Sequence, residues 1–106
     1  MDALRELELL FDLKNYSTLK KTVSELDQEI KQCPINDLID RRAALGRRVA
    51  EVERRLAACP KERRNLLYAR FSDGKSWYKI AEEMGYSREY LSGKYLRSSF
   101  RRYLAV

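Results

Sequence analysis

Apolar side chains recur three and four residues apart along most of the chain, and no stretch alternates regularly between apolar and polar residues. Spacing of three and four places side chains on one face of an α-helix, whereas strict alternation is typical of a β-strand. Only 4 Gly and 2 Pro interrupt these apolar stripes. The pattern therefore predicts an all-α fold built from amphipathic helices.

The first half of the chain is predicted to form an antiparallel, coiled-coil-like helical hairpin over residues 1–59. A first helix is expected from about Ala3 to Gln32, with a break or bend among the weak helix formers at 15–18. Pro34 stops this helix, and after a short loop a second helix begins near Asn36, antiparallel to the first. Apolar residues spaced alternately four and three apart form the seam, with Leu19, Val23, Leu26, Ile30 and Cys33 facing Leu45, Val49, Val52, Leu56 and Cys59.

The charges of the two helices are complementary. Residues 1–33 hold 5 basic and 7 acidic side chains, whereas residues 34–59 hold 6 basic and 4 acidic ones. Opposite charges beside an apolar seam favour pairing of the helices. We therefore expect ion pairs that flank the leucine-rich seam.

A further apolar stripe, formed by Leu4, Leu7, Leu10 and Phe11, precedes the hairpin seam. A two-helix hairpin buries only one side of each helix, so this stripe needs another partner. We expect a second copy of the chain to cover it, giving a homodimer through the N-terminal helices. The alternative is a monomer in which these residues pack on the C-terminal part of the same chain.

The second half, residues 60–106, is predicted to form short helices separated by turns. Pro60 opens the first of them, since proline is well tolerated at the start of a helix. Gly85 ends a helix that begins at Trp77, because glycine adopts positive φ without steric penalty. Ser76 and Ser87 are placed to cap the helices that follow them. A helix, a glycine turn and a capped second helix have the spacing of a helix-turn-helix.

The last predicted helix, residues 87–103, has an apolar side and a basic side. Aromatic side chains supply much of the expected core, namely Trp77, Tyr86, Tyr95 and Tyr103. On the basic side the only acid after Ser87 is Glu89, which lies in the first turn where the helix dipole favours it. A basic helix face after a glycine turn favours contact with DNA over simple solvation.

Individual DNA contacts can be assigned from these positions. We expect base edges to be read from the start and the basic face of the last helix, by Ser87, Arg88, Glu89, Tyr90, Gly93, Lys94 and Arg97. Basic and hydroxyl side chains near the turns and at the chain end are expected to contact phosphates. These are Arg63, Arg64, Lys75, Ser76, Lys79, Arg101 and Arg102.

The net charge of +6 lies entirely in this second half. Residues 1–59 hold 11 Lys and Arg and 11 Asp and Glu, whereas residues 60–106 hold 11 and 5. A positive excess that coincides with a helix-turn-helix pattern favours a polyanionic partner. Double-stranded DNA is the partner we expect.

The stretch LLYARFSDGKSWYKIAEEMGYS resembles the C-terminal part of small phage-encoded transcriptional regulators of the ArpU and RinA kind. That pattern is in turn similar to region 4 of bacterial sigma factors. The residues that carry the resemblance are Arg70-Phe71, Gly74-Lys75-Ser76-Trp77, Ile80-Ala81-Glu82-Glu83-Met84 and Tyr86-Ser87. The resemblance implies a sigma-like helix-turn-helix, a regulatory role in a phage or prophage, and RNA polymerase as a further partner. Lys94 departs from it, since the family pattern has an apolar residue three after Leu91.

Composition argues against several other classes of protein. The chain has no His and 2 Cys, and it shows no phosphate-binding loop and no nucleophile with a neighbouring base. We therefore expect no metal, no cofactor and no enzymatic activity. Cys33 and Cys59, separated by the second helix, would lie on the order of 35 Å apart, too far for a disulfide. No apolar run is long enough to span a bilayer, and MDALRELELL is unlike a signal peptide, so we expect a cytoplasmic protein without a membrane partner.

These observations predict a sequence-specific DNA-binding transcriptional regulator. A different reading stays open, in which the same shape serves as a protein-interaction module that binds RNA polymerase or a phage protein. Gly93 and Lys94 depart from the expected pattern of the last helix and so support this alternative. A fold by itself does not specify a function.

Overall fold

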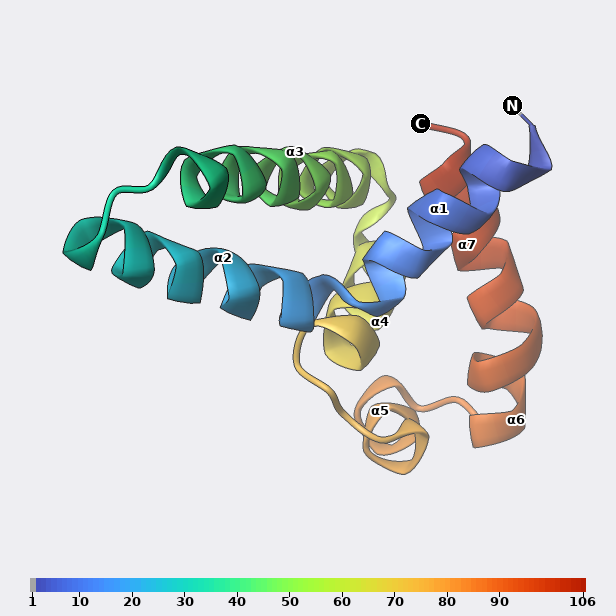
Figure 1. Cartoon of the computed structure of the whole chain (residues 1–106). Coiled ribbons are helices and arrows are strands. Elements are labelled where there is room, and N and C mark those ends of the chain that lie inside the picture. Colours follow the sequence, from blue (N-terminus) through green and yellow to red (C-terminus); the bar gives the residue numbers. More distant parts are fainter. Residues whose placement is uncertain (1) are drawn as a thin grey trace.

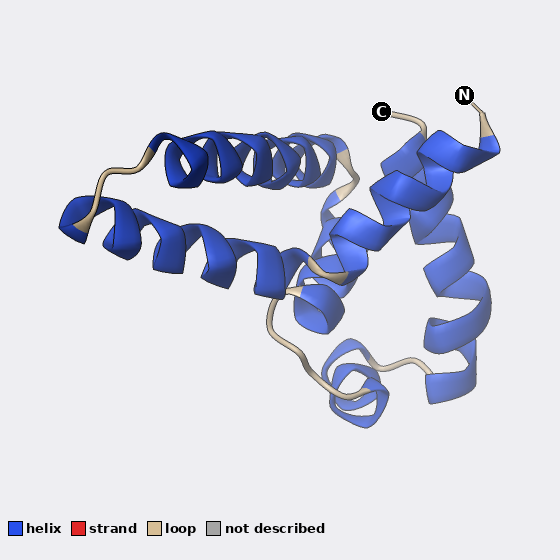
Figure 2. Ribbon diagram, viewed as in Figure 1, coloured by secondary structure: helices blue, strands red, loops and turns tan. Residues whose placement is uncertain are grey.

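The structure is a computed structural model that describes residues 2–106. Every regular element in this range is helical, and no strand occurs in it, as the apolar spacing predicts (Figures 1 and 2). The elements are α1 (Ala3–Lys14), α2 (Tyr16–Gln32), α3 (Asn36–Ala58), α4 (Lys61–Phe71), α5 (Trp77–Met84), α6 (Arg88–Tyr90), the π-helical η1 (Leu91–Tyr95) and α7 (Leu96–Leu104). The backbone stays helical from α6 through η1 into α7. Residues 88–104 therefore form one continuous helix, which we call the C-terminal helix.

The predicted hairpin is present, formed by α2 and α3. The two helices pack along their length and project from the rest of the molecule, with their connecting loop at the far end (Figure 1). Leu19 and Leu26 of α2 are buried, as are Val52 and Leu56 of α3. Arg42 Nε donates to Asp27 Oδ1 at 2.8 Å, an ion pair between the helices of the predicted kind.

The first helix departs from the predicted packing. The chain breaks at Asn15, within the expected stretch, and α1 takes a different direction from α2 and packs against α3 and α7 (Figure 1). Its buried side chains are Leu9 and Leu13, whereas three members of the predicted stripe stay exposed. Leu4, Leu7 and Phe11 retain 67%, 65% and 59% of their accessible surface. The helix has apolar residues on two faces, and α3 and α7 cover the face that carries Leu9 and Leu13.

The main core draws on both halves of the chain. Its buried members come from α1, α2, α3, α4 and α7 and from the residue after α3; they are Leu9, Leu13, Tyr16, Val52, Leu56, Cys59, Leu67 and Tyr103. The boundary expected between residues 59 and 60 therefore runs through a shared core. Burial of large apolar side chains is the main stabilising term in folding, so the two halves support each other.

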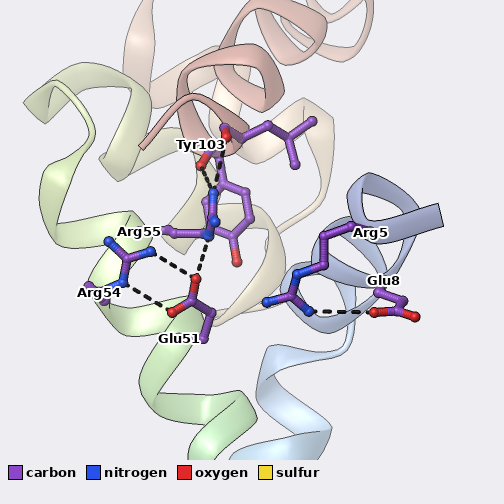
Figure 3. Close-up of polar contacts among 7 residues, drawn as sticks. Arg5, Glu8, Glu51, Arg54, Arg55 and Tyr103 are labelled. Atoms are coloured by element: carbon purple, nitrogen blue, oxygen red, sulfur yellow. Dashed lines mark hydrogen bonds and ion pairs between the residues drawn. The ribbon is translucent and has the colours of Figure 1, made fainter. Parts of the chain in front are cut away.

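A buried arginine joins α3 to the end of the C-terminal helix. Arg55 Nη1 donates to the carbonyl oxygens of Tyr103 and Leu104, each at 3.1 Å (Figure 3). Its Nε donates to Glu51 Oε1 at 2.7 Å, and Glu51 also accepts two hydrogen bonds from Arg54. The guanidinium thereby satisfies carbonyls that lack a partner at a helix C-terminus. These contacts fix the end of the C-terminal helix relative to the hairpin.

A second, smaller core lies among α4, α5 and the C-terminal helix. Its buried residues are Leu66, Ile80, Leu91 and Tyr95, with Ala69, Trp77, Ala81 and Met84 packed around them. The prediction that Trp77 contributes to packing is confirmed. Tyr95 and Tyr103 are also buried as expected, but Tyr86 is 41% exposed, so its assignment to the core was wrong.

Two further properties concern the chain as a whole. None of the helices within residues 2–106 is long and apolar enough to cross a membrane. Both cysteines are free thiols; Cys33 is exposed in the hairpin loop, and Cys59 is buried in the main core.

Candidate nucleic-acid interface

The turn between α5 and the C-terminal helix has the geometry that its residues predict. Gly85 adopts φ 76° and ψ 18°, in the left-handed region, and its N–H donates to the carbonyl oxygen of Ala81 at 2.9 Å. Ser87 is extended, and its Oγ accepts a hydrogen bond from the N–H of Tyr90 at 3.2 Å. The glycine turn and the serine cap are thus confirmed. They set the direction in which the C-terminal helix leaves the turn.

The start of α5 is capped in the same way. Ser76 Oγ accepts a hydrogen bond from the N–H of Lys79 at 3.1 Å, which confirms the predicted cap. Arg70 Nη1 donates to the carbonyl oxygen of Lys75 at 3.0 Å, and its guanidinium lies 4.9 Å from the ring centroid of Trp77. The end of the loop next to α5 is therefore held by α5 itself and by Arg70 of α4.

Lys94, which departs from the family pattern, lies beside the buried side of the C-terminal helix without joining it. Leu91 and Tyr95 are both buried, and the next buried positions are Ser99 and Tyr103, again four residues apart. Residues four apart lie on the same side of a helix. Tyr95 is therefore buried as predicted, and Lys94 lies on the exposed side.

The base-contact candidates share the exposed side of the C-terminal helix and the turn before it. Six of them are exposed, and the seventh, Gly93, is half-buried; together they are Ser87, Arg88, Glu89, Tyr90, Gly93, Lys94 and Arg97. Arg101 continues this side one turn further on and is also exposed. We call this set, with Arg101, the outer face of the C-terminal helix.

The basic residues of the outer face have no acidic partner. Among residues 2–106, no ion pair includes Arg88, Lys94, Arg97 or Arg101. The guanidinium of Arg88 lies 5.7 Å from the ring centroid of Tyr78, a contact that leaves its charge uncompensated. The positive charges of this face are therefore free to meet an anion.

The phosphate-contact candidates, by contrast, are divided over the surface. Lys75 Nζ pairs with Glu83 Oε2 at 3.0 Å, and Ser76 uses its hydroxyl as a cap. Lys79, in the first turn of α5, is exposed. Arg102 lines a depression with Ala58, Pro60, Ala105 and Val106, beside the end of the chain.

Two arginines at the start of α4 are held by contacts within the chain. The Arg63 guanidinium lies 5.0 Å from the ring centroid of Tyr95, and its Nη1 is buried without a hydrogen-bond partner. Arg64 Nη1 donates to the carbonyl oxygen of Ala57 at 3.3 Å. Both contacts reach across elements, so the local sequence offers no sign of them.

Tyrosines near the turn form a cluster that the sequence analysis did not foresee. Tyr86, Tyr90 and Tyr95 have ring centroids 5.3–5.7 Å apart. Tyr95 anchors the group from inside, with its hydroxyl donating to Glu62 Oε2 at 3.3 Å, and burial raises its pKa. Tyr78 is the most exposed of the aromatic residues nearby, at 68%. Its position two residues before buried Ile80 is the signal that could have placed it on the outer side of α5.

No group of three or more His, Cys, Asp or Glu that could hold a metal ion occurs in the described part of the chain. Comparison of the chain with known protein families, with curated proteins and with solved structures gives no match.

Proposed function

We propose that this protein is a sequence-specific DNA-binding transcriptional regulator that acts in the cytoplasm or nucleoid of a phage host. In this proposal α4, α5 and the C-terminal helix form a helix-turn-helix, and residues 87–103 enter the major groove. The resemblance to phage regulators of the ArpU and RinA kind points the same way. Such a helix reads bases mainly from its N-terminal part, where Arg88, Glu89 and Tyr90 lie.

The observation that carries the proposal is that four unpaired cations lie together on the outer face. Of the six arginines of α3, four pair with acids of the chain, namely Arg42, Arg48, Arg54 and Arg55. The four basic residues of the outer face pair with none in the described chain. Unpaired cations on one helix face suit phosphates, which supply most of the affinity of DNA-binding proteins. Arginine and lysine also recognise guanine through its O6 and N7 atoms.

The N-terminal helices would supply the contact between copies. We propose a homodimer through these helices, because Leu4, Leu7 and Phe11 remain exposed on α1. A dimer would match the two-fold symmetry common in DNA sites of this class. RNA polymerase is a further proposed partner, on the resemblance to sigma factors alone.

A salt titration tests the proposal. Binding should be measured on a duplex from upstream of the gene, on a duplex that the protein selects from a randomised library, and on a scrambled duplex. We expect tight binding to at least one of the first two, weaker binding to the scrambled duplex, and affinity that falls steeply with salt. Equal, weak binding to all three would contradict the proposal.

A pair of variants gives that experiment a matched control. Arg97→Ala should weaken specific binding and reduce the slope of the salt dependence by about 1 if Arg97 meets a phosphate. Arg41→Ala removes the same charge from an exposed position of the hairpin, which lies away from the outer face. We expect Arg41→Ala to bind like the wild type, and equal losses in both variants would indicate a general charge effect.

One observation favours the second candidate, a protein-interaction module. Tyr78 and Tyr86 are exposed and line one depression together with Arg88. Protein interfaces are enriched in tyrosine and arginine. In that case Lys94→Ala and Arg97→Ala would leave DNA affinity unchanged, while Tyr78→Ala would disrupt a complex with RNA polymerase or a phage protein.

A further inference from the structure

No steric contact in the fold explains the missing side chain of Gly93. Gly74 and Gly85 adopt positive φ, which other residues rarely do. A Cβ atom on Gly46 would lie 2.4 Å from Arg42 Nη1, the end of a flexible side chain that can shift aside. On Gly93, by contrast, a Cβ would meet only the Nη1 atom of Arg97, at 3.9 Å, which is an ordinary van der Waals distance.

The position of Gly93 makes its identity unfavourable for the helix itself. It lies inside the π turn, in the middle of the C-terminal helix. Glycine is a poor helix former because it loses the most backbone freedom on folding. Alanine would fit without a clash and would favour the helix. No contact within the fold thus requires glycine here, and what the residue faces offers a reason for it.

Gly93 faces outward among the candidate base-contact residues. Glu89 and Arg97 lie four residues before and after it, and Lys94 is its neighbour in the chain, all three exposed. The missing side chain therefore leaves a notch in the outer face, bordered by longer side chains. Glycine is favoured where a backbone must approach a ligand closely.

We propose that Gly93 is the point of closest approach between the C-terminal helix and DNA, with its backbone against the base edges of the major-groove floor. This inference rests on the proposed function. The notch lets the helix sit deep enough for Lys94 and Arg97 to reach their contacts. A Cβ atom is fixed by the backbone and cannot rotate aside, so even alanine holds the helix away from the groove floor.

The test is Gly93→Ala, measured for both folding and binding. We expect the melting temperature to rise by roughly 4–8 °C, because alanine stabilises a helix interior relative to glycine. Binding is measured on the upstream or the selected duplex, whichever the wild type binds more tightly. We expect the affinity of Gly93→Ala for this duplex to be lower by about tenfold or more, which is the effect of losing one base contact. The control is Gly46→Ala, also within a helix but in the hairpin, which should bind DNA like the wild type.

Each outcome decides one question. A higher melting temperature with weaker binding, and a normal Gly46→Ala, would support the inference. A lower melting temperature for Gly93→Ala would show that the π turn itself needs glycine, and would overturn the inference. Unchanged affinity for Gly93→Ala would overturn it as well, while leaving DNA binding intact. A wild-type chain that prefers no duplex would overturn the proposed function together with the inference.

Discussion

Arg55 offers the sharpest test of how the two halves of the chain are joined. The prediction concerns Arg55→Ala, which removes a side chain that is only 7% exposed. The guanidinium donates three hydrogen bonds, one to Glu51 and one each to the carbonyl oxygens of Tyr103 and Leu104 (Figure 3). Without it, these two carbonyls at the end of α7 lose their partner from α3.

The magnitude follows from what remains after the substitution. Breaking a buried ion pair by removing one partner costs about 3–5 kcal/mol, because the other charge is left buried and unpaired. Here Glu51 would keep both hydrogen bonds from Arg54, and its side chain is 28% exposed. The loss is then mainly that of two charged hydrogen bonds to carbonyls, each contributing about 1.5–3 kcal/mol before desolvation of the arginine is counted. We expect a net destabilisation of about 2–4 kcal/mol.

Urea unfolding of Arg55→Ala and Arg54→Ala provides the assay. Arg54 shares the same acid but is 55% exposed, and exposed ion pairs contribute at most about 1 kcal/mol. Arg55→Ala should therefore unfold at a clearly lower urea concentration than Arg54→Ala. The slope of the unfolding free energy against urea concentration should be similar in the two variants. Equal midpoints for the two variants would refute the reasoning, since they would show that the carbonyl contacts of Arg55 contribute nothing.

Two further predictions concern acid stability and assembly. Hydrogen bonds from Arg54, with a smaller contribution from Arg55, lower the pKa of Glu51 from 4.5 to about 2. Because the pKa of Glu51 is lower in the folded state, its ionised form stabilises the fold. This stabilisation is complete above pH 4.5 and is lost as the pH falls toward 2. The free energy of unfolding, measured at several pH values, should thus fall less between pH 4.5 and 2 for Glu51→Gln than for the wild type. An equal fall in both proteins would contradict the role of Glu51 in acid stability. If α1 pairs with a second copy, light scattering at micromolar concentration should give a dimer mass, which Leu7→Lys should reduce to that of a monomer; a monomeric wild type would count against the dimer.

Much of the local structure could be predicted from the sequence because it depends on neighbours along the chain. Apolar spacing identified the helices and the pairing of α2 with α3. Ser76 and Ser87 cap their helices as predicted, and Gly85 makes the left-handed turn. Each of these features involves atoms only a few residues apart, so residue type and spacing carry the information.

Parts of the candidate interface could not be predicted, because distant contacts decide which side chains are available. The sequence predicts that Arg63, Lys75 and Arg97 are all available to DNA, the first two for phosphates and Arg97 for bases. In the structure Arg63 lies against Tyr95 and Lys75 pairs with Glu83, whereas Arg97 stays exposed. Nothing local to Arg63 reveals the ring that covers it.

The sequence by itself thus determined that this protein is all-helical, where its hairpin lies and where it turns at Gly85. The tertiary structure decided which of the two apolar faces of α1 is buried. A helix with more than one possible inward face is oriented by the surfaces available to cover it, and those surfaces come from residues far away in the chain.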